Sequence, residues 1–266
     1  MSSIILGTYI QGESILHRLD PRFKLIFALI YFAAVFTAPG FYGLILSLAF
    51  TVLFIALSKI SVGKIIKSVL PLIYILIFAA IINAFFTNEG TIYWHWGIFT
   101  ISSTGLYNAA FYTIRLGILF IGMTLLTLTT SSVDITDASE RLLGWLKAIG
   151  LPVHEICMML GIALRFLPVF ADEFFKIKAA QESRGAAFSS GGLIKRTKAL
   201  LPIAIPLMAS AFRHAEGLTQ AMESRCYHGA VGRTKLREMR LEPKDWMAMG
   251  VMAIMLAGAI AMRVLI

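Results

Sequence analysis

The chain has 266 residues, of which 58% are hydrophobic and only 15% charged, and its mean hydropathy is +0.79. Soluble domains are nearer half apolar and a quarter charged, so the composition excludes an ordinary soluble protein and indicates an integral membrane protein. The formal net charge of +9 is explained first by the orientation of the protein in the membrane and second by an acidic partner. No basic run is interleaved with aromatic residues, which argues against nucleic acid.

The first 129 residues predict a membrane domain of four spans. Residues 25–58 contain no charged residue, and a helix needs only about 20 residues to cross the hydrocarbon. The turn-forming pair at 39–40 therefore divides this stretch into two spans. Asp20 and Pro21 suit the N-cap and the first position of the first helix. The four predicted spans are residues 21–38, 41–57, 68–86 and about 106–129.

The distribution of Lys and Arg predicts the orientation of these spans. Lys59, Lys64 and Lys67 follow the second span, and 16 of the 24 Lys and Arg residues lie in 130–245. Cytoplasmic loops carry such an excess of positive residues. We therefore expect a multi-pass protein of the cell membrane with its N-terminus and residues 130–245 in the cytoplasm. Residues 87–105 have no Lys or Arg and belong outside, where their "YWHW" suits the aromatic belt.

Residues 130–245 predict a cytoplasmic or interfacial domain of long helices, followed by a fifth span at 246–266. Asp134 is the expected N-cap of the first helix, which Gly150 and Pro152 end. A second helix over 152–184 should kink at Pro168. "SSGG" at 189–192 breaks the chain before a third helix at 193–225. The expected fold class is thus an all-α polytopic membrane protein with about five or more transmembrane helices.

The residue patterns of common enzymes and carriers are absent. The sequence has no G-x-x-x-x-G-K-[ST] loop for ATP, and its five histidines show no metal-ligand spacing. We therefore expect no catalytic site, metal or other cofactor. Arg115 lies within a predicted span, where a charge is by default functional. The alternative is that Arg115 bonds backbone carbonyls or a hydroxyl and only fixes helix packing, and we favour it because no span offers an acidic partner.

Glu-Ser-Arg occurs twice, each time before a small residue and at the end of a predicted helix. Gly185 is the expected residue after the first helix, and Gly229 could close the second. One such arginine would be read as a C-cap that favours the helix dipole. Two copies instead suggest paired tips whose guanidinium donors match acceptors on a partner that also comes in two copies. The two copies comprise Glu182, Ser183 and Arg184 before Gly185, and Glu223, Ser224 and Arg225 before Cys226.

Several segments together resemble the transmembrane T component of energy-coupling factor (ECF) transporters. The opening "GTYIQGESILHRLDPRFKL" (7–25) resembles the hallmark start of that family, and "LTLTTSSVDIT" (126–136) resembles its exit from the fourth span. "ALRFLP" (163–168) resembles a stretch inside its first coupling helix. The two Glu-Ser-Arg segments resemble its two Ala-Arg-Gly-type signatures, with serine in place of alanine. The residues that carry the resemblance outside these two signatures are His17, Asp20, Pro21, Arg22, Lys24, Arg165 and Pro168.

The resemblance implies a coupling subunit that does not itself hydrolyse ATP. Its partners would be two ABC-type ATPase subunits, into which the two arginine tips dock, and a small substrate-binding membrane S component. The complex would import a vitamin or a trace metal. The substrate site would lie on the S component, so this chain names no substrate. A self-contained secondary carrier or channel, with the arginines as mere caps, is the alternative.

Overall fold

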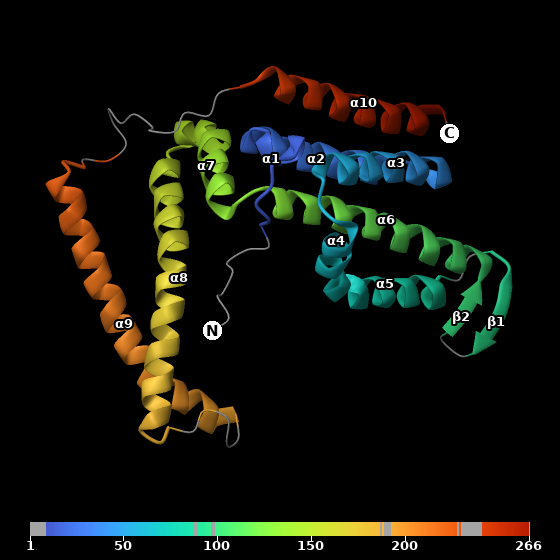
Figure 1. Cartoon of the computed structure of the whole chain (residues 1–266). Helices are drawn as coiled ribbons and strands as arrows, with labels where there is room; N and C mark the ends of the chain where they lie inside the picture. The colour runs from blue at the N-terminus through green and yellow to red at the C-terminus, as the bar shows by residue number, and fades with distance from the viewer. Residues whose placement is uncertain are drawn as a thin grey trace. The chain divides into compact units, whose positions relative to one another are not determined.

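The computed structural model describes residues 9–87, 90–96, 99–186, 188, 193–227, 229 and 241–265. The chain forms two compact units (Figure 1). The larger unit comprises Gly7–Ala138 with Met239–Ile266, and the smaller comprises Ser139–Glu238 with Met1–Leu6. The last helix therefore belongs to the same unit as the N-terminal half of the chain.

Helices dominate both units. The larger unit contains α1 (Ile15–Arg18), α2 (Pro21–Thr37), α3 (Gly40–Ser58), α4 (Val62–Val69), the 3-10 turn η1 (Leu70–Leu72), α5 (Ile73–Phe86), α6 (Ser103–Thr129) and α10 (Pro243–Leu265). α7 (Ser132–Leu142) crosses the division between the units. The smaller unit contains η2 (Leu143–Ile149), α8 (Val153–Ser183) and α9 (Leu193–Ser224). The all-α polytopic fold class is confirmed.

Within the described residues, five helical segments are long and apolar enough to cross a membrane: Gly40–Ser58, Val62–Phe86, Ser103–Thr129, Val153–Ser183 and Pro243–Val264. Four of them coincide with predicted spans. The predicted first span is α2, a helix of 17 residues that packs on α6 and α10. α8 is the additional candidate span. The sequence analysis did not predict it as a span because its ends are charged, although its middle is apolar.

The core of the larger unit lies where α2, α3, α6 and α10 meet. The Tyr31 hydroxyl lies 2.8 Å from the Thr51 hydroxyl and donates to the Ile118 carbonyl at 2.9 Å. These polar atoms satisfy one another, as groups inside an apolar bundle must. A Cβ at Gly122 would lie 2.3 Å from the Tyr31 ring, so glycine is needed where α6 approaches α2. The buried residues around Tyr31 are Ala34, Val35, Ala38, Leu44, Ile118, Leu119, Met252, Met255 and Ala259.

A two-stranded hairpin precedes α6, and the sequence analysis did not predict it. β1 (Ile92–Trp96) pairs antiparallel with β2 (Phe99–Ser102), so the "YWHW" segment is a strand. The Ser102 hydroxyl accepts the Gly105 amide at 2.9 Å and donates to the Thr87 carbonyl at 2.8 Å. This cap starts α6 at Ser103, three residues before the predicted start.

The helix boundaries around 130–152 correct one predicted cap and confirm another. Ser131, rather than Asp134, caps α7: its hydroxyl accepts the Asp134 amide at 3.1 Å and donates to the Asp134 carboxylate at 2.7 Å. The serine stands three residues before the acid, which is the spacing of a capping box. Gly150 ends η2 in the left-handed conformation, with φ +85°, as predicted.

The two long helices of the smaller unit pack against each other. The predicted kink at Pro168 is wrong: α8 is one helix of 31 residues, and it shows no sharp bend in Figure 1. The Ser210 hydroxyl of α9 donates to the Glu173 carboxylate of α8, and His214 lies 3.8 Å from that carboxylate. The predicted break at 189–192 lies outside the described residues.

Candidate functional site

The first Glu-Ser-Arg copy ends α8 in a Schellman cap. Arg184 is the C-cap residue of the helix. The Gly185 amide donates to the Glu182 carbonyl at 3.0 Å, and the Ala186 amide donates to the Gln181 carbonyl at 3.0 Å. Gly185 has φ +86°, the left-handed conformation that this cap requires directly after the C-cap residue. The predicted role of Gly185 at the helix end is confirmed.

The second copy ends α9 with the same pair of bonds. The Cys226 amide donates to the Glu223 carbonyl at 2.9 Å, and the Tyr227 amide donates to the Met222 carbonyl at 3.0 Å. Cys226 takes the left-handed conformation, with φ +55°. The expectation that Gly229 closes this helix is wrong, because the cap is already complete at Cys226.

The two caps therefore place Arg184 and Arg225 at equivalent positions of two helices. Each arginine is the first residue after the last helical one, and each is exposed. Neither guanidinium has a hydrogen bond or ion pair with any residue that the structure describes. Five N–H donors in a rigid planar fork are thus available at each tip, which suits a carboxylate or backbone carbonyls of another protein.

The serines and glutamates of the two copies have local roles. The Ser183 hydroxyl donates to the Ala179 carbonyl and the Ser224 hydroxyl to the Ala221 carbonyl, both at 3.0 Å. The Glu182 carboxylate lies 3.7 Å from the Lys178 ammonium, one turn earlier. Glu223 is exposed, and its carbonyl belongs to the cap. These residues shape the tips, and the arginines are left as the free donors.

The N-terminal motif folds around the His17 side chain. Its Nε2 lies 2.9 Å from the Ile10 carbonyl and its Nδ1 lies 2.6 Å from the Ser14 hydroxyl. A carbonyl only accepts, so Nε2 carries the proton and Nδ1 accepts from Ser14. Burial and the nearby Lys24 lower the pKa of His17, while the bond to Ile10 raises it. The imidazole is therefore neutral at pH 7. Its hydrogen bonds to Ile10 and Ser14 hold the segment before α2 in place.

Lys24 is buried near the start of α2 and ties it to the end of α6. Its ammonium donates to the Thr129 carbonyl at 2.9 Å and to the His17 carbonyl at 3.3 Å. The Ile10 amide also donates to the Leu128 carbonyl at 3.0 Å. Carbonyls at the end of a helix have no partner within it, so Lys24 and Ile10 complete the last turn of α6.

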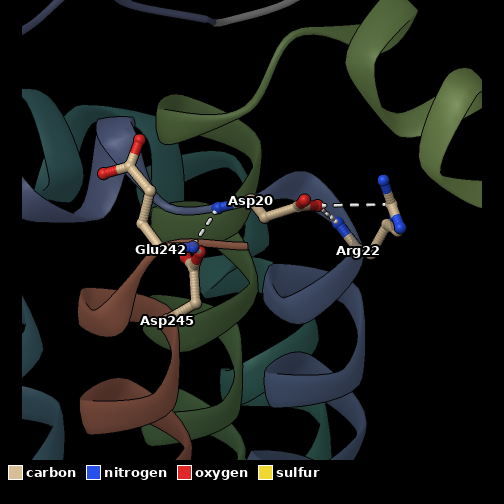
Figure 2. Close-up of polar contacts among 4 residues, drawn as sticks. All are labelled: Asp20, Arg22, Glu242 and Asp245. Carbon is tan, nitrogen blue, oxygen red and sulfur yellow. Dashed lines mark hydrogen bonds and ion pairs between the residues drawn. The ribbon is translucent and has the colours of Figure 1, made fainter. Parts of the chain in front are cut away.

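Asp245 joins the start of α10 to the start of α2 (Figure 2). One oxygen of its buried carboxylate accepts the Asp20 amide at 3.0 Å, and the other accepts the Glu242 amide at 2.9 Å. The carboxylate thus lies at the positive ends of two helix dipoles. Asp20 in turn caps α2 by accepting the Arg22 amide at 2.9 Å, and the Arg22 guanidinium lies 3.6 Å from it. Pro21 takes the first helical position, as predicted.

Three predicted residues lie elsewhere. Arg165 and Pro168 are exposed on α8, away from the tip at Arg184. Arg115 donates to the Ala38 carbonyl at the end of α2, and its guanidinium carbon lies 4.4 Å from the centre of the Phe111 ring. The predicted bond of Arg115 to a backbone carbonyl is confirmed.

Residues 12–236 match the model of the CbiQ family, which is described as cobalt transport protein. The chain belongs to this family. The energy-coupling factor transporter transmembrane protein EcfT of Brevibacillus brevis is 45% identical over 92% of this chain and 92% of its own length. The EcfT protein of Ruminiclostridium cellulolyticum is 43% identical over 98% of this chain and 97% of its own length. The EcfT protein of Bacillus subtilis is 41% identical over 92% of each chain.

The CbiQ match includes both helix tips and the motif around His17, and it ends before α10. Membership of this family, with relatives of this description along nearly the whole chain, makes the chain a transmembrane component of an energy-coupling factor transporter. Such a transporter is a complex with further subunits. The expected T component of ECF transporters is confirmed.

Sequence reasoning missed Asp245 as a member of the N-terminal cluster. The signal was local and incomplete: Asp245 follows Glu242 and Pro243 with the spacing of an acid in the first helical turn. That spacing predicts a cap for α10. It does not predict the second acceptor bond to Asp20, which is 225 positions away.

Proposed function

We propose that this CbiQ-family chain transmits ATP-driven motion from two ATPase subunits to a separate substrate-binding S component of an importer for vitamins or trace metals. Each ATPase receives one arginine-tipped helix, Arg184 on α8 and Arg225 on α9. When the ATPases close on ATP, they move the two tips together. The packed helices α8 and α9 carry this movement to the S component, which reorients and releases its substrate inward.

The matched caps carry this proposal. Both tips have the same backbone hydrogen bonds, a residue in the left-handed conformation directly after the arginine, and an exposed arginine. Two equivalent donor groups in one chain suit two equivalent grooves on partners that are copies of each other. A rigid helix end presents its arginine with little further ordering, which favours a strong and specific contact.

The geometry of the larger unit supports the proposed cytoplasmic position of residues 130–245. The starts of α2 and α10 share the Asp245 carboxylate, and the end of α6 bonds to Lys24. Three helix ends therefore lie on one side of the unit. The predicted orientation needs this arrangement, because the N-terminus, the exit of the fourth span and the entry of the fifth are all placed in the cytoplasm.

Purification under native conditions tests the proposal. An affinity-tagged chain, extracted in mild detergent without crosslinking, should bring two ATPase chains and one small membrane protein per copy. The complex should hydrolyse ATP, and the chain stripped of its partners should neither bind nor hydrolyse it, because it lacks a phosphate-cradling loop. A chain that purifies alone and transports after reconstitution alone would instead be a self-contained carrier.

A further inference from the structure

A polar cavity of about 670 Å³ lies beside the N-terminal motif, within the larger unit. Residues 10–14, α1, the end of α3 and the start of α4 line it. The lining includes the cationic side chains of Arg18, Lys59 and Lys64, together with the hydroxyls of Ser58 and Ser61. Neither the motif's packing nor the proposed coupling mechanism uses this cavity.

The cavity has an excess of positive charge. The Arg18 guanidinium is paired with the Glu13 carboxylate at 3.1 Å, and both lie at the cavity. The ammonium groups of Lys59 and Lys64 have no ion pair with any residue that the structure describes. His17 is neutral at pH 7, because burial lowers its pKa and its Nδ1 accepts from the Ser14 hydroxyl. Two ammonium groups without an ion pair among the described residues therefore line the polar cavity.

The backbone holds one of these lysines in an unusual conformation. Lys59 ends α3 with φ +53°, in the left-handed region that costs a side chain roughly 1–2 kcal/mol. Glycine would take this position without strain. Ser61 precedes α4, and its side chain makes no capping bond, so its hydroxyl is free to donate into the cavity.

The cavity lies at the end of a helix that is long and apolar enough to cross a membrane. α3 is an uncharged span of 19 residues, and Lys59 follows its last residue directly. α4 then places the buried Ile65 inward while Lys64 stays exposed. Basic pockets at such helix ends are suited to the headgroups of anionic lipids.

An apolar cavity of about 310 Å³ lies on the opposite face of α1. Ile15, Leu16 and Leu19 line it from α1 and its end, whereas Ser14, His17 and Arg18 line the polar cavity. At the end of α3, Leu57 lines the apolar cavity and the next residues, Ser58 and Lys59, line the polar one. The two cavities share no lining residue, so the polar cavity by itself is the candidate site.

We propose that the polar cavity binds the phosphate headgroup of an anionic phospholipid through Lys59 and Lys64. Its place directly after α3, a helix long and apolar enough to cross a membrane, favours a lipid over free phosphate. The two lysines select an anionic headgroup over a zwitterionic one.

Native mass spectrometry of the full chain in its detergent-solubilised complex tests this proposal. The probes are phosphatidylglycerol and phosphatidylcholine with matched acyl chains, and inorganic phosphate as a competitor. The variant is Lys59→Gln with Lys64→Gln, and the matched control is Lys67→Gln, on the same helix α4 but outside the cavity lining. All three positions are exposed, so the substitutions should not disturb folding.

We expect the unmodified chain to retain phosphatidylglycerol in preference to phosphatidylcholine. Each lysine near a membrane surface contributes about 1 kcal/mol to anionic lipid binding, so affinity should fall about fivefold per lysine and about 25-fold in the double variant. Lys67→Gln should bind as the unmodified chain does. Equal lipid retention by the double variant, or an equal loss in Lys67→Gln, would overturn the proposal. Displacement of the lipid by excess inorganic phosphate would overturn the lipid assignment in favour of a free-anion site.

Discussion

Cys226 is held in a conformation that suits glycine. Its φ of +55° costs an L-residue roughly 1–2 kcal/mol, and glycine removes that strain while adding some entropy to the unfolded chain. We expect Cys226→Gly to raise the stability of the α9 end by about 0.5–1 kcal/mol. Cys226→Val should lower it by at least as much, because a β-branched residue suits this region least.

The measurement is protection of the tip against limited proteolysis, together with the apparent melting temperature of the complex. Gly185→Ala is the matched control at the other tip. A Cβ at Gly185 would meet no atom within 4 Å, so its effect reports backbone strain alone. If Gly185→Ala leaves the stability unchanged, the positive φ at these caps does not control the stability of the helix ends.

Arg184 and Arg225 carry the proposed docking, and their removal separates docking from capping. If each guanidinium is buried in an ATPase groove, Arg→Ala leaves partner acceptors unpaired and costs about 2–5 kcal/mol. If each only caps its helix, the cost is no more than about 1 kcal/mol. We expect each single variant to lose most substrate uptake, and the double variant to lose the ATPases or to uncouple their hydrolysis from transport.

Uptake in vesicles and ATPase co-purification are the measurements for these variants. Arg→Lys at each tip is the control, since it keeps the charge but loses the planar fork. Lysine variants should enter the membrane as the unmodified chain does, without full uptake. Normal assembly and transport by a well-expressed double alanine variant would contradict the docking proposal.

Among the elements, α2 and α10 are joined by one carboxylate. Replacing Asp245 with Asn keeps one acceptor oxygen and places an amide N–H₂ against the other backbone N–H. An unsatisfied buried donor costs about 1–3 kcal/mol, and Asp245 is only 1% exposed. We expect Asp245→Asn to lower the apparent melting temperature of the detergent-solubilised protein, and Asp245→Ala to lower it further.

Glu242→Gln is the control for this junction. The Glu242 side chain is 59% exposed and pairs only with Lys244 among its described contacts, at 2.7 Å, and surface pairs contribute about 0–1 kcal/mol. The amide of Glu242, which Asp245 accepts, is unchanged in this variant. A loss as large as that of Asp245→Asn would show that charge at the start of α10, rather than the shared carboxylate, stabilises the junction.

For the whole molecule, the decisive property is which residues face each side of the membrane. In a variant without Cys157 and Cys226, single cysteines at Thr91 and Lys67 probe two exposed positions. We expect a membrane-impermeant reagent added to intact cells to label Thr91→Cys and to leave Lys67→Cys unlabelled until the membrane is opened. The excess of Lys and Arg on one side is the physical reason. The reverse labelling pattern would invert the orientation. The predicted outer site near residue 88 lies outside the described residues, and so does the predicted inner loop at 232–244 except for its last four residues.

The sequence by itself determined the membrane class, most helix boundaries and both arginine positions. These depend on local chemistry: apolar length, caps and left-handed residues act within a few positions of the chain. The start of α2 at Pro21, the end of η2 at Gly150 and the cap at Gly185 follow the expected rules. The predicted kink at Pro168 is wrong, because α8 continues as one helix past the proline, which has no N–H to donate.

Only the tertiary structure decided what the buried polar groups do. Lys24 bonds to Thr129, Arg115 to Ala38 and Asp245 to Asp20, and in each case the partner is a backbone atom at a distant helix end. Every residue type carries such atoms, so no sequence pattern marks them as partners. Burial forces each charged group to find an acceptor or donor, and which one it reaches depends on how the helices pack.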